Sequence, residues 1–152
     1  MARIHISDED AATRQFLTFL ITEEGHEVSV STAGLEALES MLVRPPDLLI
    51  LDLAMPDVDG FAVLSEIGDY QTLASMKILV LTAKSAEQDR EHAFELGADA
   101  YLTKPCDEDE LQATVRDLLA LTKEQLRLRQ RDERDKARLL SQLESVVEKQ
   151  GS

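Results

Sequence analysis

The stretch Asp47-Leu-Leu-Ile-Leu-Asp-Leu-Ala-Met-Pro-Asp-Val-Asp-Gly60 decides the fold of this chain. Residues 48–52 are an apolar run that ends in a carboxylate, and the turn residues Pro56 and Gly60 follow, which predicts a short strand buried on both faces. Asp52 therefore stands at the carboxyl end of a strand, where open α/β sheets bind their ligands. A lone Asp at such a place is more often a turn or helix-capping residue, so the other strand ends decide its role.

The chain up to residue 121 alternates short β-rich segments with helical segments whose apolar residues recur on one face. We expect strands at 3–7, 27–31, 48–52, 76–82 and 98–103, and helices at 11–24, 32–43, 60–70, 86–96 and from residue 107 onward. Right-handed crossovers between such strands place helices on both faces of a parallel sheet. We predict a flavodoxin-like, doubly wound (βα)5 α/β fold with a five-stranded parallel sheet in the order 2-1-3-4-5, plus a long C-terminal helix.

Composition limits the function classes. The chain has 152 residues, of which 43% are apolar, enough for one domain with a packed core. Residues 1–121 carry 8 Lys and Arg against 24 Asp and Glu, so this acidic body predicts no direct nucleic-acid binding. The single Cys106 excludes an internal disulfide, fits a reducing compartment and is interpreted as a small semi-buried hydrophobe. No leader and no membrane-length apolar run are found, so we expect a cytoplasmic protein without a membrane segment.

Polar side chains follow four of the five predicted strands. Asp8 and Glu9 follow the first, Asp52 ends the third, Thr82 ends the fourth and Lys104 follows the fifth. Crowded carboxylates repel one another unless a cation lies between them, and hard oxygen ligands suit Mg²⁺. A hydroxyl and an ammonium group suit the oxygens of a phosphoryl group. The residues therefore predict a Mg²⁺-assisted phosphoryl site with a carboxylate as nucleophile.

Four motifs in order resemble the receiver domains of two-component response regulators over residues 3 to about 121. They are Asp8-Glu9, Leu51-Asp-Leu-Ala-Met-Pro-Asp-Val-Asp-Gly60, Leu81-Thr-Ala83 and Gly97-Ala-Asp-Ala-Tyr-Leu-Thr-Lys-Pro105. The resemblance implies that Asp52 accepts a phosphoryl group from a histidine kinase or histidine phosphotransfer protein. It also implies that Mg²⁺ is held by Asp8, Glu9, Asp52 and the backbone carbonyl of Ala54.

The same resemblance gives roles to the remaining motif residues. Thr82 and Lys104 bind phosphoryl oxygens, Tyr101 turns inward on activation, and Lys104-Pro105 is a cis peptide bond. The chain departs from the family pattern at Glu9, where Asp is commoner. It also departs at His5, which occupies a usually apolar strand position and is interpreted as a hydrogen-bonded, partly covered side chain rather than a ligand.

Residues 122–152 lie outside the resemblance and form a second region, a charged helical extension after a receiver domain at 1–121. Residues 123–138 carry 11 charges without Gly or Pro, and an apolar stripe follows at helical spacing. Apolar heptad positions are interrupted by Arg129, Glu133 and Lys136. We expect this extension to dimerise as a coiled coil that leads to an output module; the alternative is a solvated, fraying extension. If residues 107–149 are helical throughout, the helix is about 65 Å long at 1.5 Å per residue. The heptad a and d positions that carry apolar residues are Leu119, Leu126, Leu140, Leu143 and Val147.

Three function classes follow from these residues. The first is a phosphorylation-controlled switch that is not an enzyme, apart from catalysing its own phosphorylation and dephosphorylation. The second is a phosphorylation-independent interaction module that dimerises through its C-terminal helix. The third, a phosphohydrolase with an aspartyl intermediate, is disfavoured because Ala54 stands where a second acid is expected. The joint presence of Asp52, Thr82 and Lys104 favours the switch.

Overall fold

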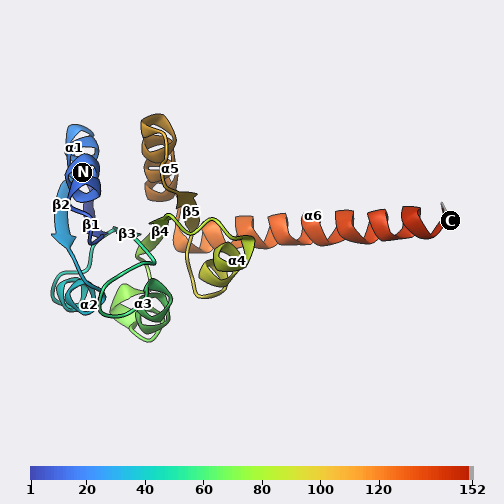
Figure 1. The fold of residues 1–152 in the computed structure, drawn as a ribbon, viewed down its shortest axis with the longest axis horizontal. Coiled ribbons are helices and arrows are strands. Elements are labelled where there is room, and N and C mark those ends of the chain that lie inside the picture. Colours follow the sequence, from blue (N-terminus) through green and yellow to red (C-terminus); the bar gives the residue numbers. More distant parts are fainter. Residues whose placement is uncertain (151–152) are drawn as a thin grey trace.

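The computed structural model describes residues 1–150, and the side chains of residues 1–148. Figure 1 shows the predicted alternation of strands and helices along residues 3–120. The strands are β1 (Arg3–Ser7), β2 (Glu27–Ser31), β3 (Leu48–Leu51), β4 (Lys77–Thr82) and β5 (Ala100–Thr103). The helices are α1 (Ala11–Glu23), α2 (Gly34–Val43), α3 (Gly60–Ile67), the 3-10 turn η1 (Gln71–Leu73), α4 (Glu87–Glu95), α5 (Glu108–Ala120) and α6 (Lys123–Gln150).

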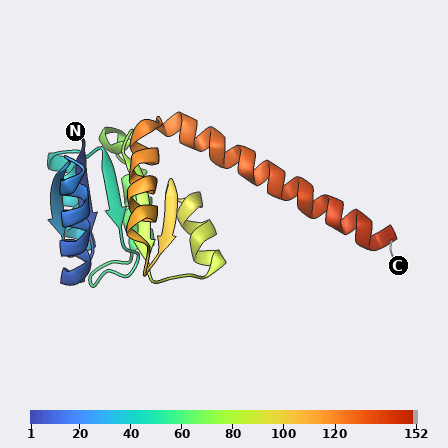
Figure 2. The same ribbon diagram turned by 90° about the horizontal axis from the view of Figure 1, so that it is seen from above.

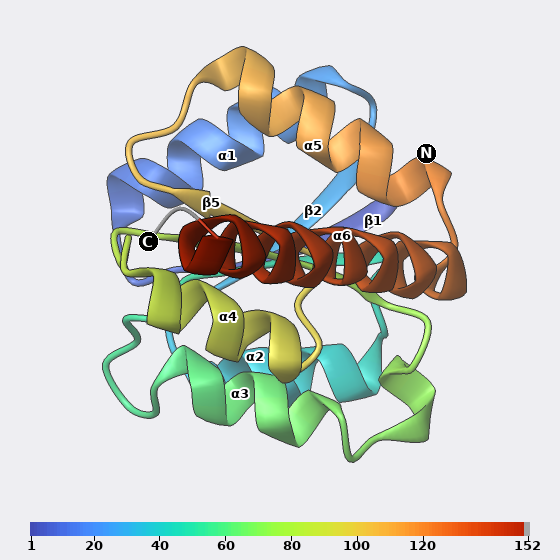
Figure 3. The same ribbon diagram turned by 90° about the vertical axis from the view of Figure 1, so that its right-hand side faces the viewer.

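The five strands form one parallel sheet in the order β2-β1-β3-β4-β5, which confirms the predicted fold class. Helices α1 and α5 cover one face, and α2, α3 and α4 cover the other (Figure 3). Alternate residues of β3 enter the two cores, Leu48 and Ile50 with α1 and α5, and Leu49 and Leu51 with α2 and α3. All four are buried, as expected for a central parallel strand.

Side chains fix where several helices begin. The Asp10 carboxylate accepts from the Thr13 amide at 3.1 Å to cap α1, and Asp59 caps α3 in the same way through Ala62. Helix α2 has no capping side chain next to it in sequence. The carboxylate of Asp57, in the loop after β3, accepts instead from the amides of Leu35 and Gly34. These bonds lower the pKa of Asp57 to about 2 and tie the loop that follows Asp52 to α2.

The predicted long C-terminal helix is present as α6, but it does not continue the preceding helix α5, so residues 107–149 are not helical throughout. Helix α5 ends at Ala120, Leu121 is extended (φ −107°, ψ 153°) and α6 begins at Lys123. The break is a reciprocal cap between Thr122 and Gln125. The Gln125 amide donates to the Thr122 hydroxyl at 3.1 Å, and the Thr122 amide donates to the Gln125 side chain at 2.9 Å. The four-residue pattern Thr-x-x-Gln was the overlooked sequence signal for this new helix start.

The first turns of α6 pack on the α/β domain formed by β1 to α5. Leu126, expected at a coiled-coil position, is 1% exposed and belongs to the core under α1 and α5. Lys123 forms a partly buried ion pair with the buried Asp99, and the Gln130 side-chain amide donates to the carbonyl of Ala98. Beyond Gln130, α6 projects away from the sheet on the β5 side (Figure 2). No helix within residues 1–150 is long and apolar enough to cross a membrane.

Candidate functional site

The carboxylates of Asp8 and Asp52 lie side by side at the carboxyl edge of the sheet. The Asp52 amide donates to the Ser7 carbonyl at 3.0 Å, which continues the β1–β3 pairing to the point where both acids emerge. Asp8 is 2% exposed and Asp52 is 7% exposed. Each carboxylate also accepts one nearby backbone amide, from Asp10 at 2.9 Å and from Ala54 at 3.1 Å. The two acids are therefore buried and held in fixed orientations.

Lys104 joins these two acids. Its ammonium nitrogen lies 2.7 Å from Asp8 Oδ2 and 3.1 Å from Asp52 Oδ2. Burial alone would lower the pKa of Lys104, but the hydrogen bonds to Asp8 and Asp52 offset this effect and the pKa is raised. The Lys104–Pro105 peptide bond is cis. Because one ammonium group contacts both carboxylates, both acids reach a shared cation position.

Thr82 and Tyr101 are connected through the backbone of Lys84. Thr82 is fully buried, and its hydroxyl oxygen accepts from the Lys84 amide at 3.4 Å. The Tyr101 hydroxyl donates to the Lys84 carbonyl at 2.6 Å, and burial raises the pKa of Tyr101. The Lys104 amide in turn donates to the Thr82 carbonyl at 2.8 Å. The backbone of Lys84 therefore links the Thr82 hydroxyl to the Tyr101 hydroxyl.

The donor set fits a divalent metal ion in part. Asp8 and Asp52 offer hard carboxylate oxygens that already share a cation, and these are the ligands that Mg²⁺ prefers. Glu9, the other expected ligand, is exposed. Within the described residues, no three His, Cys, Asp or Glu side chains gather closely enough to hold a metal ion. The structure therefore brings Asp8, Asp52 and Lys104 together and leaves Glu9 at the surface.

Gly60 has a close-contact role that its interpretation as a turn residue missed. A Cβ atom at Gly60 would lie 2.5 Å from Leu53 Cα and 2.9 Å from the Asp52 carbonyl oxygen. Only glycine allows the start of α3 to approach the backbone of Asp52 and Leu53 so closely. Arg14 was also missed: its guanidinium donates to the Asp8 carbonyl at 2.7 Å. Both residues hold the backbone around the two acids.

His5 lies below the site in β1 and is 1% exposed. Its Nδ1 lies 2.7 Å from the Ser29 hydroxyl, and its Nε2 lies 2.9 Å from the Ser31 hydroxyl. Burial lowers the pKa of His5 to about 4, so the ring is neutral at pH 7. His5 is a hydrogen-bonded core residue and binds neither Asp8 nor Asp52.

The parallel sheet with two buried acids, a hydroxyl and an ammonium at its carboxyl edge places the chain in the class of doubly wound α/β domains with a polar site at that edge. The family model described as the response regulator receiver domain matches residues 4–116. The chain belongs to this family of receiver domains.

Two curated relatives and one solved structure show the extent of the similarity. The DNA-binding dual master transcriptional regulator RpaA of Synechocystis is 38% identical over 122 residues, which cover 80% of this chain and 51% of RpaA. The response regulator MprA of Mycobacterium leprae is 39% identical over 121 residues, covering 80% of this chain and 52% of MprA. This chain thus spans about half the length of these relatives. A two-component response regulator from Clostridium difficile superposes with a TM-score of 0.74 at 26% identity, covering 79% of this chain and 97% of that one.

Proposed function

We propose that Asp52 accepts a phosphoryl group from a histidine kinase or histidine phosphotransfer protein in a Mg²⁺-dependent reaction, and that this modification switches a protein interface. The observation that carries the proposal is the shared contact of Lys104 with Asp8 and Asp52. It places the candidate nucleophile beside a second acid and a fixed positive charge. Thr82, buried at the end of the neighbouring strand, adds a hydroxyl to the same edge.

In this reaction an oxygen of the Asp52 carboxylate forms a bond to phosphorus while the bond from phosphorus to the donor histidine nitrogen breaks. The Lys104 ammonium and the Thr82 hydroxyl stabilise the phosphoryl oxygens. Asp8 and Asp52 would hold Mg²⁺, and the exposed Glu9 and the Ala54 carbonyl are the further ligands that the family resemblance implies. When bound, the metal would supply positive charge to the phosphoryl oxygens. Asp8 holds Lys104 in place before the phosphoryl group arrives.

The site supports a switch better than a hydrolase or a phosphorylation-independent module. Ala54 has no acidic side chain, so no acid stands two residues after Asp52, where a phosphohydrolase would use one as a general acid. An interaction module without phosphoryl chemistry has no need for two buried acids around a lysine, because burying charge is costly. We propose no reaction on a separate metabolite, only phosphorylation and dephosphorylation of this chain.

Replacing Asp52 with Asn is expected to abolish phosphorylation. Wild-type protein incubated with acetyl phosphate and Mg²⁺ should gain one phosphoryl group, and the gain should disappear when EDTA removes the metal. Intact-mass spectrometry measures the product. Asp57→Asn is the matched control, because this nearby acid caps α2 rather than contacting Lys104. Stoichiometric phosphorylation of the Asp52→Asn variant would show that another residue is the acceptor.

Occupying the site is also expected to change self-association through α6. Thr82 connects to Tyr101 through Lys84, and α6 is anchored to the segment just before β5 by Lys123 and Gln130. We expect beryllofluoride with Mg²⁺ to shift the monomer–dimer equilibrium at least about fivefold, a typical coupling between two sites. Light scattering across a concentration series measures the shift, with Asp52→Asn as the control. Equal equilibria with and without beryllofluoride would contradict the proposed switch.

A further inference from the structure

The distal half of α6 carries an apolar stripe that the receiver does not cover. These side chains are 50 to 67% exposed, although each is a Leu or Val: Leu139, Leu140, Leu143, Val146 and Val147. An exposed, contiguous apolar stripe on a projecting helix marks a surface for another protein. The proximal half of α6 cannot extend the stripe, because Leu126 is already buried in the receiver core.

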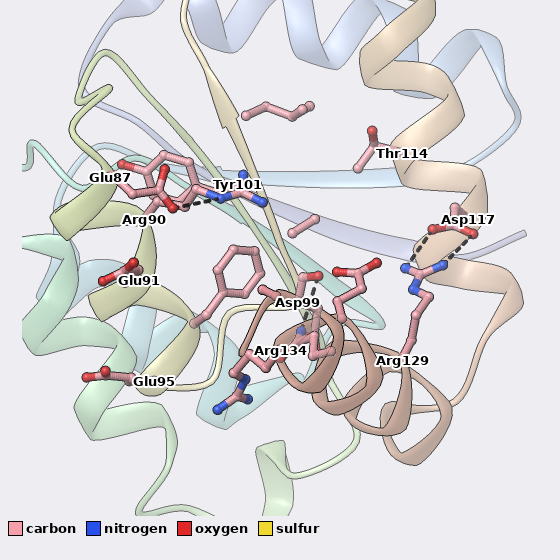
Figure 4. Close-up of a pocket in the computed structure, with 16 residues that line it drawn as sticks. Glu87, Arg90, Glu91, Glu95, Asp99, Tyr101, Thr114, Asp117, Arg129 and Arg134 are labelled. Atoms are coloured by element: carbon pink, nitrogen blue, oxygen red, sulfur yellow. Dashed lines mark hydrogen bonds and ion pairs between the residues drawn. The ribbon is translucent and has the colours of Figure 1, made fainter. Parts of the chain in front are cut away.

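A groove of about 700 Å³ lies between α4, β5, α5 and α6 (Figure 4). Along α4 its wall carries Glu87, Glu91 and Glu95, and on the opposite side Arg129 of α6 pairs with Asp117 of α5 at 2.9 Å. Phe94, Ala100 and Leu102 add apolar surface among the lining residues. Glu133 and Ala137 of α6 also line this groove, so one face of the helix borders it directly.

The a and d heptad positions of α6, where a coiled-coil partner would pack, are charged in the proximal half and apolar in the distal half. Heptad positions 129, 133 and 136 are charged, whereas positions 140, 143 and 147 are apolar. A parallel pair would set Arg129, Glu133 and Lys136 each against its own copy, which places like charges together at three successive positions. An antiparallel pair instead places every charged position against an apolar one. The facing residues are then Arg129 with Val147, Glu133 with Leu143, and Lys136 with Leu140.

We propose that α6 pairs in antiparallel orientation with α6 of a second copy of this chain, with the two-fold axis beside Arg138. The inference rests on the proposed dimerisation through the C-terminal helix and specifies its geometry. The long aliphatic stems of Arg129 and Lys136 cover the partner's apolar stripe while their charges stay in water. Arg129 is suited to this position because Asp117 already neutralises it. The partner's distal stripe then lies against the α6 wall of the groove.

Such a pairing brings the second copy close to the elements that lead from the site. Tyr101, whose hydroxyl bonds to the Lys84 carbonyl, lines the same groove as Glu133 and Ala137. A helix bound at this groove would contact side chains of β5 and α4, so a shift of either element would change its contacts. A parallel coiled coil would join the distal stripes to each other and leave the groove uncovered.

Cross-linking of single-cysteine chains tests the orientation. In a Cys106→Ser background, Leu139→Cys is expected to cross-link to itself with a short bismaleimide, because position 139 lies one residue from the two-fold axis of the antiparallel pair. Val147→Cys should not cross-link to itself. Its two copies lie 18 residues apart along the helix pair, which is about 27 Å at a rise of 1.5 Å per residue. Val43→Cys is the matched control, at an exposed position on α2 far from α6.

The outcomes separate the alternatives. Efficient self-cross-linking of Val147→Cys, with little at Leu139→Cys, would establish a parallel coiled coil and overturn the proposal. The proposal would also be overturned if light scattering showed only monomers up to about 100 μM, a concentration at which even a weak dimer should form. Leu140→Asp should weaken the dimer at least tenfold, whereas Val43→Asp should leave it unchanged. Phosphorylation of the same variants is measured separately. Absence of the antiparallel dimer would therefore not count against Asp52 as the phosphorylated residue.

Discussion

Lys104→Met is expected to slow phosphorylation of Asp52 by about 100-fold and to destabilise the metal-free fold by about 2 kcal/mol. The rate falls because a fixed positive charge no longer faces the phosphoryl oxygens. Stability falls because two buried carboxylates, at 2.7 and 3.1 Å from the ammonium, lose the cation that they share. The expected loss is smaller than the roughly 3–5 kcal/mol for removing one partner of a buried ion pair, because the Lys104 side chain is 23% exposed and water reaches it.

Mg²⁺ should reverse part of this destabilisation. A divalent cation bound between Asp8 and Asp52 would replace the missing positive charge, so added Mg²⁺ should stabilise Lys104→Met more than the wild type. Urea unfolding with EDTA and with Mg²⁺ measures the difference, and intact mass follows phosphorylation. Lys84→Met is the control: it removes one charge near the site, but the Lys84 ammonium lies over the Phe61 ring, 5.5 Å from its centroid. Equal Mg²⁺ responses in all three proteins would contradict a metal position between the two acids.

Acidification from pH 6.5 to pH 4 is expected to cost about 3 kcal/mol of stability through His5 alone. The pKa of His5 is about 4 in the folded chain, against 6.5 for an unperturbed histidine. Between these values the unfolded chain binds a proton that the folded chain does not, so stability falls as the pH falls. The stability that the lowered pKa of His5 contributes is fully present above pH 6.5 and is lost as the pH falls to 4.

His5→Gln should remove this part of the pH dependence. Glutamine can still hydrogen-bond to Ser29 or Ser31 but does not titrate, so the variant's stability should vary less between pH 6.5 and pH 4. Urea unfolding at a series of pH values measures the difference. His92→Gln is the control because His92 is exposed on α4. Parallel pH curves for the wild type and His5→Gln would show that burial does not suppress His5 protonation.

The sequence by itself determined the sheet, the strand order and the edge on which the site lies. The apolar run of β3 and the alternating segments around it predict parallel strands, because a strand covered on both faces needs apolar residues at every position. Parallel strands end at one edge, so Asp8, Asp52, Thr82 and Lys104 could be grouped without coordinates. The predicted helix ends differ from the observed ones: α3 ends at Ile67 rather than at Tyr70, and α4 covers Glu87–Glu95 rather than residues 86–96.

Tertiary structure decided the contacts that depend on distances between elements. Lys104 reaches acids 96 and 52 residues away, and Asp57 caps α2 from another loop. These contacts join segments whose separation and orientation no residue pattern encodes. Leu126 shows this most clearly, because its heptad spacing is as compatible with a coiled coil as with packing on the receiver core. Burial in the receiver core or against a second helix removes the same apolar surface from water, so only the position of α6 on the receiver could distinguish them.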